Sequence, residues 1–405
     1  MKILSVHNKY QIRGGEDYCH EEECALLRLH GHILDSYEEN NNKLVDFTPF
    51  KSAQKTIWSQ ETFNSISNIL TTHRYDLVHV HNFFPLVSPS VYYAAYNNGV
   101  PIIQTLHNYR LLCPNGLFFR QGKVCEACLG KTLPWPSVLH GCYKEDRLAS
   151  AAVASMLFTH SLLSTWIDKV DAYIALTEFA RQKFISGGLP PEKIFVKPNF
   201  VYNDLGSGLG SGNYAIYVGR LSVEKGLDIL LDAWTRLSVK LPLKIIGDGP
   251  LANVVSQASE SNSSIEWLGR KPIQEVYELI GEAKFLIFPS KWYETFGRVA
   301  IEAFSKGTPV IASRFGAMAE LIDHRRTGLH FTPGDAVDLA TQVDWAMSHE
   351  SELAAMRHAA RSEFEQHYTA AANYARLMEI YESAIQAKGT AIPSVPIAQS
   401  IGASE

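Results

Sequence analysis

The sequence predicts an α/β protein with two Rossmann-like domains that face a central cleft. Short apolar runs alternate with helix-periodic segments along most of the 405 residues, which is typical of parallel α/β sheets. A Gly/Ser-rich run at 205–212 lies almost at mid-chain and has the composition of a flexible linker. In the second half, a loop with a glutamate follows an apolar run, and ligands of open parallel sheets bind at such strand ends.

The apolar runs and helical periods set the expected elements. In the first half we expect helices at 17–30 and 178–186, and strands at 3–6, 77–80, 102–105, 172–176 and 194–196. In the second half we expect helices at 227–239, 273–281 and 299–306, and strands at 214–218, 243–246, 265–268, 285–288 and 309–312.

These elements divide the chain into consecutive units. An N-terminal domain at 1–204 carries a Cys-rich insertion at 113–142, and a linker at 205–212 leads to a C-terminal domain at 213–368. A last helix is expected at 369–386, followed by an Ala/Ser/Pro/Gly-rich tail at 387–405 that we expect to be disordered.

Composition and charge narrow the class of protein. The net charge of −5, with 46% hydrophobic and 20% charged residues, is ordinary for a soluble globular protein and lacks the basic excess of a nucleic-acid binder. The first seven residues form a strand-like run without a signal-peptide pattern, so we expect a cytoplasmic protein. Residues 148–167 contain no charged side chain; a buried or half-buried helix is favoured, and interfacial contact with a membrane stays open.

The most informative segment holds two glutamates eight positions apart, Glu294 and Glu302. A strand, a loop and a helix are expected in that order, which places Glu294 in the loop and Glu302 about one turn into the helix. A carboxylate accepts hydrogen bonds from sugar hydroxyls, and free amides at a helix start suit a diphosphate. The alternative is two surface glutamates. The loop amides expected to contact the ligand belong to Thr295, Phe296 and Gly297.

This segment resembles the E-x7-E signature of the retaining glycosyltransferases of family 4, also called group 1, which have the GT-B architecture. In that family the first glutamate holds donor-sugar hydroxyls and the second holds the ribose of the nucleotide. The resemblance implies that the C-terminal domain binds a nucleotide-sugar donor and that the N-terminal domain lies on the acceptor side. It also implies that the last helix crosses back to the first domain.

A second segment resembles the donor motif G-R-x-x-x-x-K-G of the family. Arg220 ends a strand-and-Gly turn and Lys225 follows five residues later, so the resemblance assigns both cations to the donor diphosphate. The alternative is a solvated pair on a loop. Gly247, in a strand-end turn, and Arg270, in a loop that touches the base in resembling enzymes, complete the expected donor site.

The first domain contributes a glycine pair and a histidine. Gly14 and Gly15 follow the first strand, and the equivalent loop of the family faces the donor diphosphate; a tight turn alone is the alternative. His107 ends the strand at 102–105, where the family has a histidine near the reacting sugar. A structural histidine is the alternative.

Four of the six cysteines lie within 30 positions: Cys113, Cys125, Cys128 and Cys142. A C-x2-C knuckle with two flanking cysteines in a loop-rich segment favours a tetrahedral structural zinc site. Reduced unliganded thiols and a redox or cluster role remain as alternatives. No ligand position would be left open for catalysis.

We therefore expect a retaining glycosyltransferase that moves a sugar from a UDP- or GDP-sugar to a glycan or lipid-linked acceptor, in polysaccharide or glycoconjugate biosynthesis. Glu294, Lys225, Arg220 and His107 would act on the reacting groups, and no catalytic metal is expected. Peripheral contact with the inner face of the membrane is compatible with such acceptors. The alternatives are a nucleotide-sugar isomerase (epimerase) of similar architecture and a non-catalytic nucleotide-sugar-binding protein.

Overall fold

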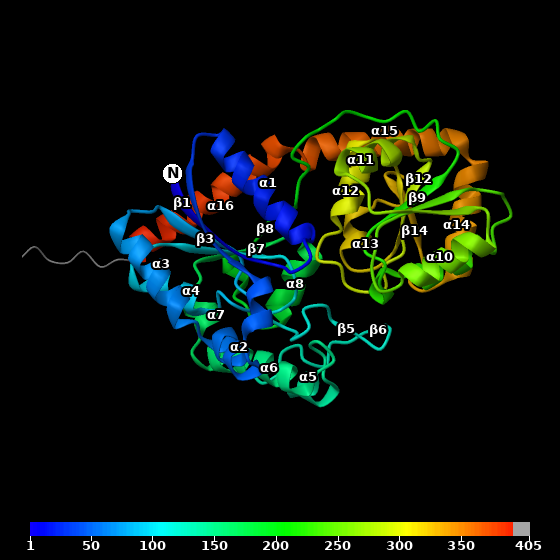
Figure 1. Cartoon of the computed structure of the whole chain (residues 1–405). Coiled ribbons are helices and arrows are strands. Elements are labelled where there is room, and N and C mark those ends of the chain that lie inside the picture. Colours follow the sequence, from blue (N-terminus) through cyan, green and yellow to red (C-terminus); the bar gives the residue numbers. More distant parts are fainter. Residues whose placement is uncertain (392–405) are drawn as a thin grey trace, which may run out of the picture.

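The computed structural model describes residues 1–391, which form two domains that lie side by side, each built on a six-stranded parallel sheet (Figure 1). The first sheet has the order β2-β1-β3-β4-β7-β8. Its strands are β1 (Lys2–Lys9), β2 (Ile33–Asn40), β3 (Leu77–Asn82), β4 (Ile102–Leu106), β7 (Ala172–Ala175) and β8 (Ile194–Val196).

The second sheet has the order β11-β10-β9-β12-β13-β14. Its strands are β9 (Ala215–Val218), β10 (Leu243–Ile246), β11 (Ile265–Gly269), β12 (Phe285–Phe288), β13 (Val310–Ser313) and β14 (Gly328–Phe331). The two parallel sheets confirm the predicted fold class.

Two edge strands were not predicted. β2 lies at the edge of the first sheet, and most of its side chains are at least partly exposed, so it lacks the apolar run that marks a buried parallel strand. β14, at the edge of the second sheet, is only four residues long. The structure identifies both as strands by their hydrogen-bonded pairing, β2 with β1 and β14 with β13.

Helices cover both faces of each sheet, because alternate strand residues point to opposite sides. Leu4 and Val6 join one apolar cluster and Ile3 joins another across the first sheet. The helices of the first domain are α1 (Gly15–Leu29), α2 (Pro49–Ile57), α3 (Gln60–Thr72), α4 (Ser90–Asn97), α5 (Trp135–His140), α6 (Arg147–Leu162), α7 (Thr165–Asp168) and α8 (Glu178–Ser186). The second domain has α9 (Leu227–Trp234), α10 (Ala252–Ser261), α11 (Ile273–Glu282), α12 (Arg298–Ser305), α13 (Ala317–Leu321), α14 (Ala336–Ser348) and α15 (Glu350–His367).

The helix predicted at 227–239 is shorter than expected. α9 ends at Trp234 and not at 239; the Trp234 indole N–H donates to the carbonyl of Leu241 at 2.9 Å, within the loop that follows.

The uncharged segment at 148–167 falls in α6 and α7. Within residues 1–391 we find no helix with the length and apolar character needed to cross a bilayer.

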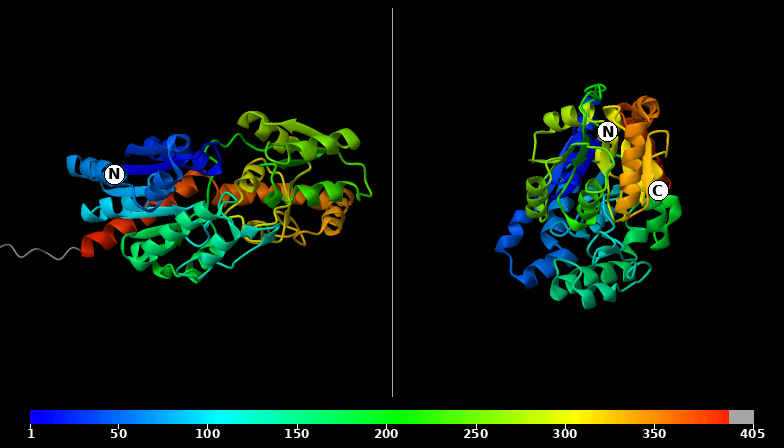
Figure 2. Two further views of the ribbon diagram at one scale, coloured as in Figure 1. Left: turned by 60° about the horizontal axis from the view of Figure 1, so that its bottom comes forward. Right: turned by 90° about the vertical axis from the view of Figure 1, so that its right-hand side faces the viewer.

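The last helix, α16 (Ala370–Ala391), returns to the first domain as predicted (Figures 1 and 2). Leu377, Ile380 and Tyr381 are buried in the cluster that contains Ile3 and Leu77 of the first sheet. The helix continues five residues beyond the predicted end at 386, so residues 387–391 do not belong to a disordered tail. Residues 392–405 lie outside the described part of the chain.

The Gly/Ser run at 205–212 is bonded to the second domain along its length, where a flexible linker was predicted. The amides of Gly208, Gly210 and Gly212 donate to the carbonyls of Lys306, Gly281 and Glu282 at 2.9–3.0 Å. A Cβ atom on Gly208 would lie 2.2 Å from the carbonyl oxygen of Gly281. Glycine is therefore required here by close backbone contact.

Candidate active site

A cavity of about 370 Å³ lies between the two domains. It is lined from the first domain by the start of α1 and by the residue after β4, and from the second by the loops after β9 and β12. The structure thus brings to one cleft nine of the predicted residues: Gly14, Gly15, His107, Arg220, Lys225, Glu294, Thr295, Phe296 and Gly297.

Glu294 is buried and fixed by three donors to one carboxylate oxygen. Its Oε1 accepts from Lys225 Nζ at 2.6 Å, Ser290 Oγ at 2.8 Å and Trp292 Nε1 at 2.8 Å. β9 and β12 are neighbours in the sheet, so the loops after them place Lys225 and Glu294 together. The lysine balances the charge of the carboxylate, and the other two donors fix its orientation.

A glycine allows the two loops to meet. Gly226 follows Lys225 directly and has φ +72°, and a Cβ atom there would lie 1.9 Å from the carbonyl oxygen of Pro289. Any other residue would push the Lys225 loop away from the Glu294 loop. The Gly in the K-G pair therefore supports the geometry of the carboxylate–lysine pair.

The loop that carries Glu294 also contacts the first domain. Thr295 Oγ1 donates to the carbonyl of His107 at 2.8 Å, and Thr177 Oγ1 donates to the carbonyl of Thr295 at 3.2 Å. The carboxylate of Glu320 accepts from the amides of Glu178 and Phe179, at the first turn of α8, at 2.9 and 2.8 Å. These contacts set the distance between the walls of the cleft.

Glu302 is buried in α12 and does not line the cavity. Its Oε1 accepts from Arg298 Nε at 2.8 Å, and Arg298 Nη2 donates to Glu22 Oε1 of α1 at 2.6 Å. Arg298 does line the cavity, and it joins the two domains through this ion-pair chain. Sequence reasoning missed Arg298, although its place directly after Gly297, at the start of the helix, is visible in the sequence.

Gly247 and Arg270 also lie outside the cavity lining. A Cβ atom on Gly247 would be 1.9 Å from the carbonyl oxygen of Gly219, so Gly247 packs behind the turn that carries Arg220. The Arg270 side chain is 64% exposed and lies 3.4 Å from Asp248. Their predicted contacts with the donor stay predictions.

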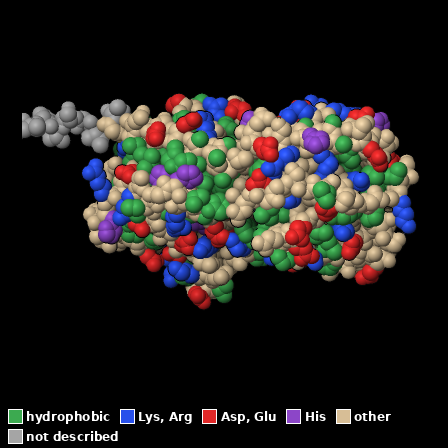
Figure 3. Space-filling model, turned by 90° about the horizontal axis from the view of Figure 1, so that it is seen from above, with side chains coloured by type: hydrophobic (Ala, Val, Ile, Leu, Met, Phe, Trp, Pro, Cys, Tyr) green, Lys and Arg blue, Asp and Glu red, His purple; other side chains and the backbone are tan. Residues whose placement is uncertain are grey.

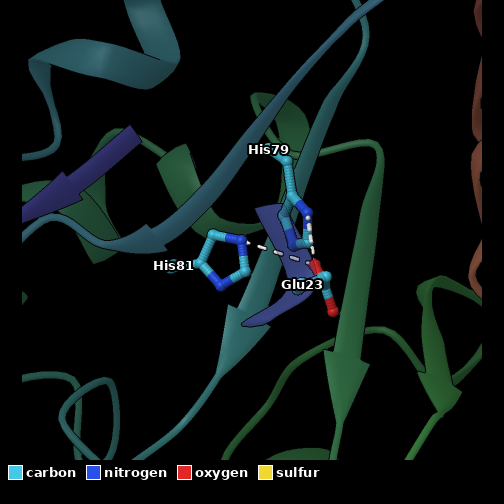
Figure 4. Close-up of side chains that lie close together, drawn as sticks. All are labelled: Glu23, His79 and His81. Atoms are coloured by element: carbon cyan, nitrogen blue, oxygen red, sulfur yellow. Dashed lines mark ion pairs between the residues drawn. The ribbon is translucent and has the colours of Figure 1, made fainter. Parts of the chain in front are cut away.

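His107 belongs to a buried group of histidines beneath the cavity. Its Nε2 lies 3.3 Å from His81 Nδ1. Figure 4 shows His81 and His79 on β3 turned toward Glu23 of α1; the ring nitrogens lie 3.4 and 3.2 Å from its Oε1. Lys197 Nζ donates to the other oxygen of Glu23 at 2.9 Å.

This group is held by internal hydrogen bonds. Among the described residues, Glu23, His79 and His81 are the set whose ligand atoms lie within 4.8 Å of one another. However, His79 already bonds Tyr381 Oη at 2.7 Å and Thr105 Oγ1 at 2.8 Å, and Lys197 supplies the balancing charge. Glu23 Oε1 has no hydrogen-bond partner among the described residues, but the charge of the carboxylate is balanced by Lys197, so the arrangement favours a charge-balanced polar network over a cation site.

Burial sets the ionisation of this network. It lowers the pKa of His107 to about 3 and the pKa of His81 well below its usual range, so both rings are neutral at physiological pH. Burial acts to raise the pKa of Glu23, but Lys197 and His79 outweigh it and hold that pKa below its usual value. His107 thus offers the cleft a neutral ring.

Glu16 is a cavity residue that sequence reasoning missed. Its Oε2 accepts from Tyr10 Oη at 2.9 Å and from Asn108 Nδ2 at 3.3 Å, while Oε1 is buried and has no hydrogen-bond partner among the described residues. Burial raises the pKa of this carboxyl to about 7. The one sequence signal is its position directly after the glycine pair.

The predicted zinc ligands gather around a different, much smaller cavity in the insertion. It is lined by Cys113, Cys125, Cys128 and Cys142.

Residues 208–363 match the profile described as Glycosyl transferases group 1, and residues 31–204 match Glycosyltransferase Family 4. An uncharacterised glycosyltransferase of Methanocaldococcus jannaschii is 27% identical over 85% of this chain and 87% of its own length. The crystal structure of Anabaena HepE in complex with UDP-glucose aligns over 95% of this chain and 100% of its own, with a TM-score of 0.67 and 19% identity. Sucrose-phosphate synthase of Thermosynechococcus elongatus aligns over 95% and 99%, with a TM-score of 0.70 and 15% identity.

The two sheets, the cleft between them and the crossing helix define a GT-B protein, as in these solved structures. The chain belongs to the group 1, or family 4, glycosyltransferases, and it is a glycosyltransferase. This confirms the resemblance drawn from Glu294, Glu302, Arg220 and Lys225.

Proposed function

We propose that this protein transfers a sugar from a nucleotide-diphosphate donor to a glycan or lipid-linked acceptor with retention of anomeric configuration. The observation that carries the proposal is the pairing of Lys225 with Glu294 at 2.6 Å on the wall of the interdomain cavity. The lysine supplies charge for a leaving diphosphate, and the carboxylate supplies an acceptor for sugar hydroxyls.

The donor would lie across the second domain. Arg220 and Lys225 would bind the diphosphate with the loop amides of Thr295 to Gly297, and Glu294 would hold the sugar. We assign the ribose to Glu302, which must then share its carboxylate with Arg298. The solved HepE structure contains UDP-glucose, so a UDP-sugar is the first donor to test and a GDP-sugar the second.

Retention would follow from front-face attack, in which the leaving phosphate oxygen takes the proton of the acceptor hydroxyl. Three donors hold Oε1 of Glu294, which suits a carboxylate that binds and orients a sugar hydroxyl. The protein would act through position and charge. The neutral His107 ring would hold a sugar hydroxyl without adding charge.

Names of relatives support a setting in polysaccharide assembly. One relative, 27% identical over 52% of this chain, is an amylovoran biosynthesis glycosyltransferase of Erwinia amylovora. We extend this to a glycan or lipid-linked acceptor here. Peripheral contact with a membrane stays a proposal; flotation with anionic liposomes tests it, and protein that remains wholly unbound would end it.

The test begins with a thermal-shift screen of UDP, GDP, ADP and their sugar conjugates. Binding stabilises the folded state by roughly 3 kcal/mol at a hundredfold excess over the dissociation constant. A shift with one nucleotide series would identify the base. No shift with any nucleotide would contradict a preformed donor site.

Lys225→Ala then tests the role of the cation. We expect kcat/KM to fall by about 100-fold or more, because one electrostatic contact to the leaving group is removed. Lys291→Ala is the matched control, since Lys291 pairs with Asp228 at 2.8 Å and does not line the cavity. Near-normal transfer by Lys225→Ala would remove the basis of the proposal. Epimerised donor without an acceptor would instead favour the isomerase.

A further inference from the structure

The insertion between β4 and α6 contains a second polar cluster that the transfer reaction does not use. It folds as a two-stranded antiparallel hairpin, β5 (Phe119–Arg120) and β6 (Lys123–Val124), followed by α5 (Figure 1). Its four cysteines line one cavity of about 10 Å³, which is roughly the room that one water molecule needs. All four are free thiols.

Backbone hydrogen bonds place the four positions around that cavity. The amide of Cys113 donates to Tyr109 O at 2.9 Å, that of Cys125 to Phe118 O at 2.7 Å, and that of Cys142 to Ser137 O at 2.9 Å. The knuckle from Cys125 to Cys128 is closed by a turn in which Leu129 N donates to Glu126 O at 3.0 Å. Three separate loops thus bring the four cysteines to one cavity. Among the described residues, no three of their sulfur atoms lie within 4.8 Å of one another, so a shared metal would require the side chains to turn inward.

The fold of the insertion needs an additional source of stability. Its two strands have two residues each, and Phe118 and Gln121 have φ of 50° and 52° although neither is glycine. Lys144 and Glu145, just after the insertion, have φ of 55° and 56°. Left-handed backbone costs about 1 kcal/mol or more at each such residue. Such short strands contribute little on their own, so a cross-link would account for the ordered loops.

We propose that Cys113, Cys125, Cys128 and Cys142 bind one Zn²⁺ in a structural, tetrahedral site. Four thiols would lose four protons as four Zn–S bonds form, which leaves a tetrathiolate centre of charge −2. Arg120, which also lines the cavity, offsets part of this charge. The thiols of Cys113 and Cys128 now donate to Asn115 Oδ1 at 3.0 Å and Pro134 O at 3.8 Å, so binding requires both to rotate inward.

The site would order one wall of the donor cleft. Glu126, inside the C-x2-C knuckle, accepts from Lys183 Nζ of α8 at 2.6 Å, and Lys183 lies 4.8 Å from the centre of the Tyr293 ring. Tyr293 precedes Glu294. From the other side of the insertion, Tyr109 Oη donates to Glu294 O at 3.5 Å. The metal would therefore hold two supports of the Glu294 loop.

Metal analysis of the full chain, expressed with zinc and purified without chelator, tests the proposal. We expect about one zinc per chain in the wild type and in Cys24→Ser, and far less than one in Cys125→Ser and Cys142→Ser. Cys24 is the matched control because it is a buried thiol outside the insertion, 3.3 Å from His20. Zinc well below one per chain in the wild type, or full zinc in both insertion variants, would overturn the site.

A second measurement does not depend on the folding of any variant. Wild-type protein loaded with Co²⁺ should show the intense near-ultraviolet absorption of thiolate–cobalt bonds and the visible bands of a tetrahedral ion. Octahedral cobalt bands without thiolate absorption would overturn the proposal. Iron with a brown, oxygen-sensitive absorption would overturn zinc in favour of a cluster.

Discussion

At the scale of single residues, Glu16 is the titratable group of the cleft whose charge changes near neutral pH. Burial raises its pKa to about 7, while His7 and the hydrogen bonds from Tyr10 and Asn108 partly oppose that rise. The carboxyl is neutral below this pH and charged above it. Gly14 and Gly15, which we assign to the diphosphate side of the cleft, line the same cavity.

We predict that UDP binding weakens as the pH rises from 6 to 8, by up to about tenfold, because the ionised Glu16 repels the diphosphate. Isothermal titration at several pH values measures this. Glu16→Gln should flatten the dependence that remains after the titration of UDP itself is subtracted. Glu21→Gln, which changes an exposed carboxylate paired with Arg13, should leave the pH dependence of UDP binding unchanged. Superimposed profiles for wild type and Glu16→Gln would show that Glu16 does not face the diphosphate.

The role of a residue could be predicted where it depends on the position of that residue relative to a strand or a motif in the sequence. Lys225 and Glu294 each follow a predicted strand, and the resemblance to the family motifs assigns both to the donor site; the pairing of β9 with β12, which brings them together, is seen only in the structure. The partner of Glu302 could not be predicted. Arg298 is four residues away, but its second contact, Glu22, belongs to the other domain and depends on how the domains pack. Glu16 was missed because its raised pKa results from tertiary burial.

At the scale of elements, prediction succeeded for buried strands and failed for elements defined by their neighbours. β12 has the predicted bounds because it is a continuous apolar run, and β10 also has them although Lys244 interrupts its apolar residues. β2 is polar on its exposed edge and is specified by pairing with β1. The glycine run at 205–212 was interpreted as flexible, yet its composition serves the close approach to Gly281. Composition alone does not distinguish these two uses of glycine.

α16 contributes to the core of the first domain, although it comes from the far end of the chain. Leu377 is fully buried in the cluster shared with β1 and β3. We predict that Leu377→Ala lowers the free energy of unfolding by about 2–5 kcal/mol, through lost burial and the cavity left behind. Urea denaturation followed by circular dichroism measures the change.

The control for α16 is Glu379→Ala on the opposite face, where the side chain is 65% exposed and pairs with Arg376. A change within about 0.5 kcal/mol is expected there. Equal effects of Leu377→Ala and Glu379→Ala would mean that α16 is not held by its apolar face.

At the scale of the whole molecule, the surface and the interior distribute charge differently. The face shown in Figure 3 carries Lys/Arg and Asp/Glu side chains interspersed, without a broad patch of one sign. The expectation of no nucleic-acid partner stays a prediction. The interior of the first domain instead concentrates imidazoles, Glu23 and Lys197 in one network between α1, β3 and α16.

This network should make the protein sensitive to acid. Burial lowers the pKa of His20 and His107 to about 3 and that of His81 well below 6.5. The unfolded chain binds protons on these rings as the pH falls below about 6.5, and the folded chain does not, so stability is present above this pH and is lost below it. Glu16, whose pKa is raised, acts in the opposite sense and reduces the change of the free energy of unfolding with pH.

We therefore predict that the unfolded chain binds at least one proton more than the folded chain between pH 6.5 and 5. This difference lowers the free energy of unfolding by about 1.4 kcal/mol or more for each pH unit of acidification. Urea midpoints measured from pH 8 to pH 5 give the slope. His81→Gln should reduce this slope by the equivalent of about one proton, since Gln cannot take up the charge. The control is His367→Gln, which should leave the slope unchanged because the His367 side chain is 56% exposed. The groups that face these rings are His7, His79, Asp17, Glu23 and Lys197. A midpoint that stays constant between pH 7 and 5 would show that the buried imidazoles are not the source of acid sensitivity.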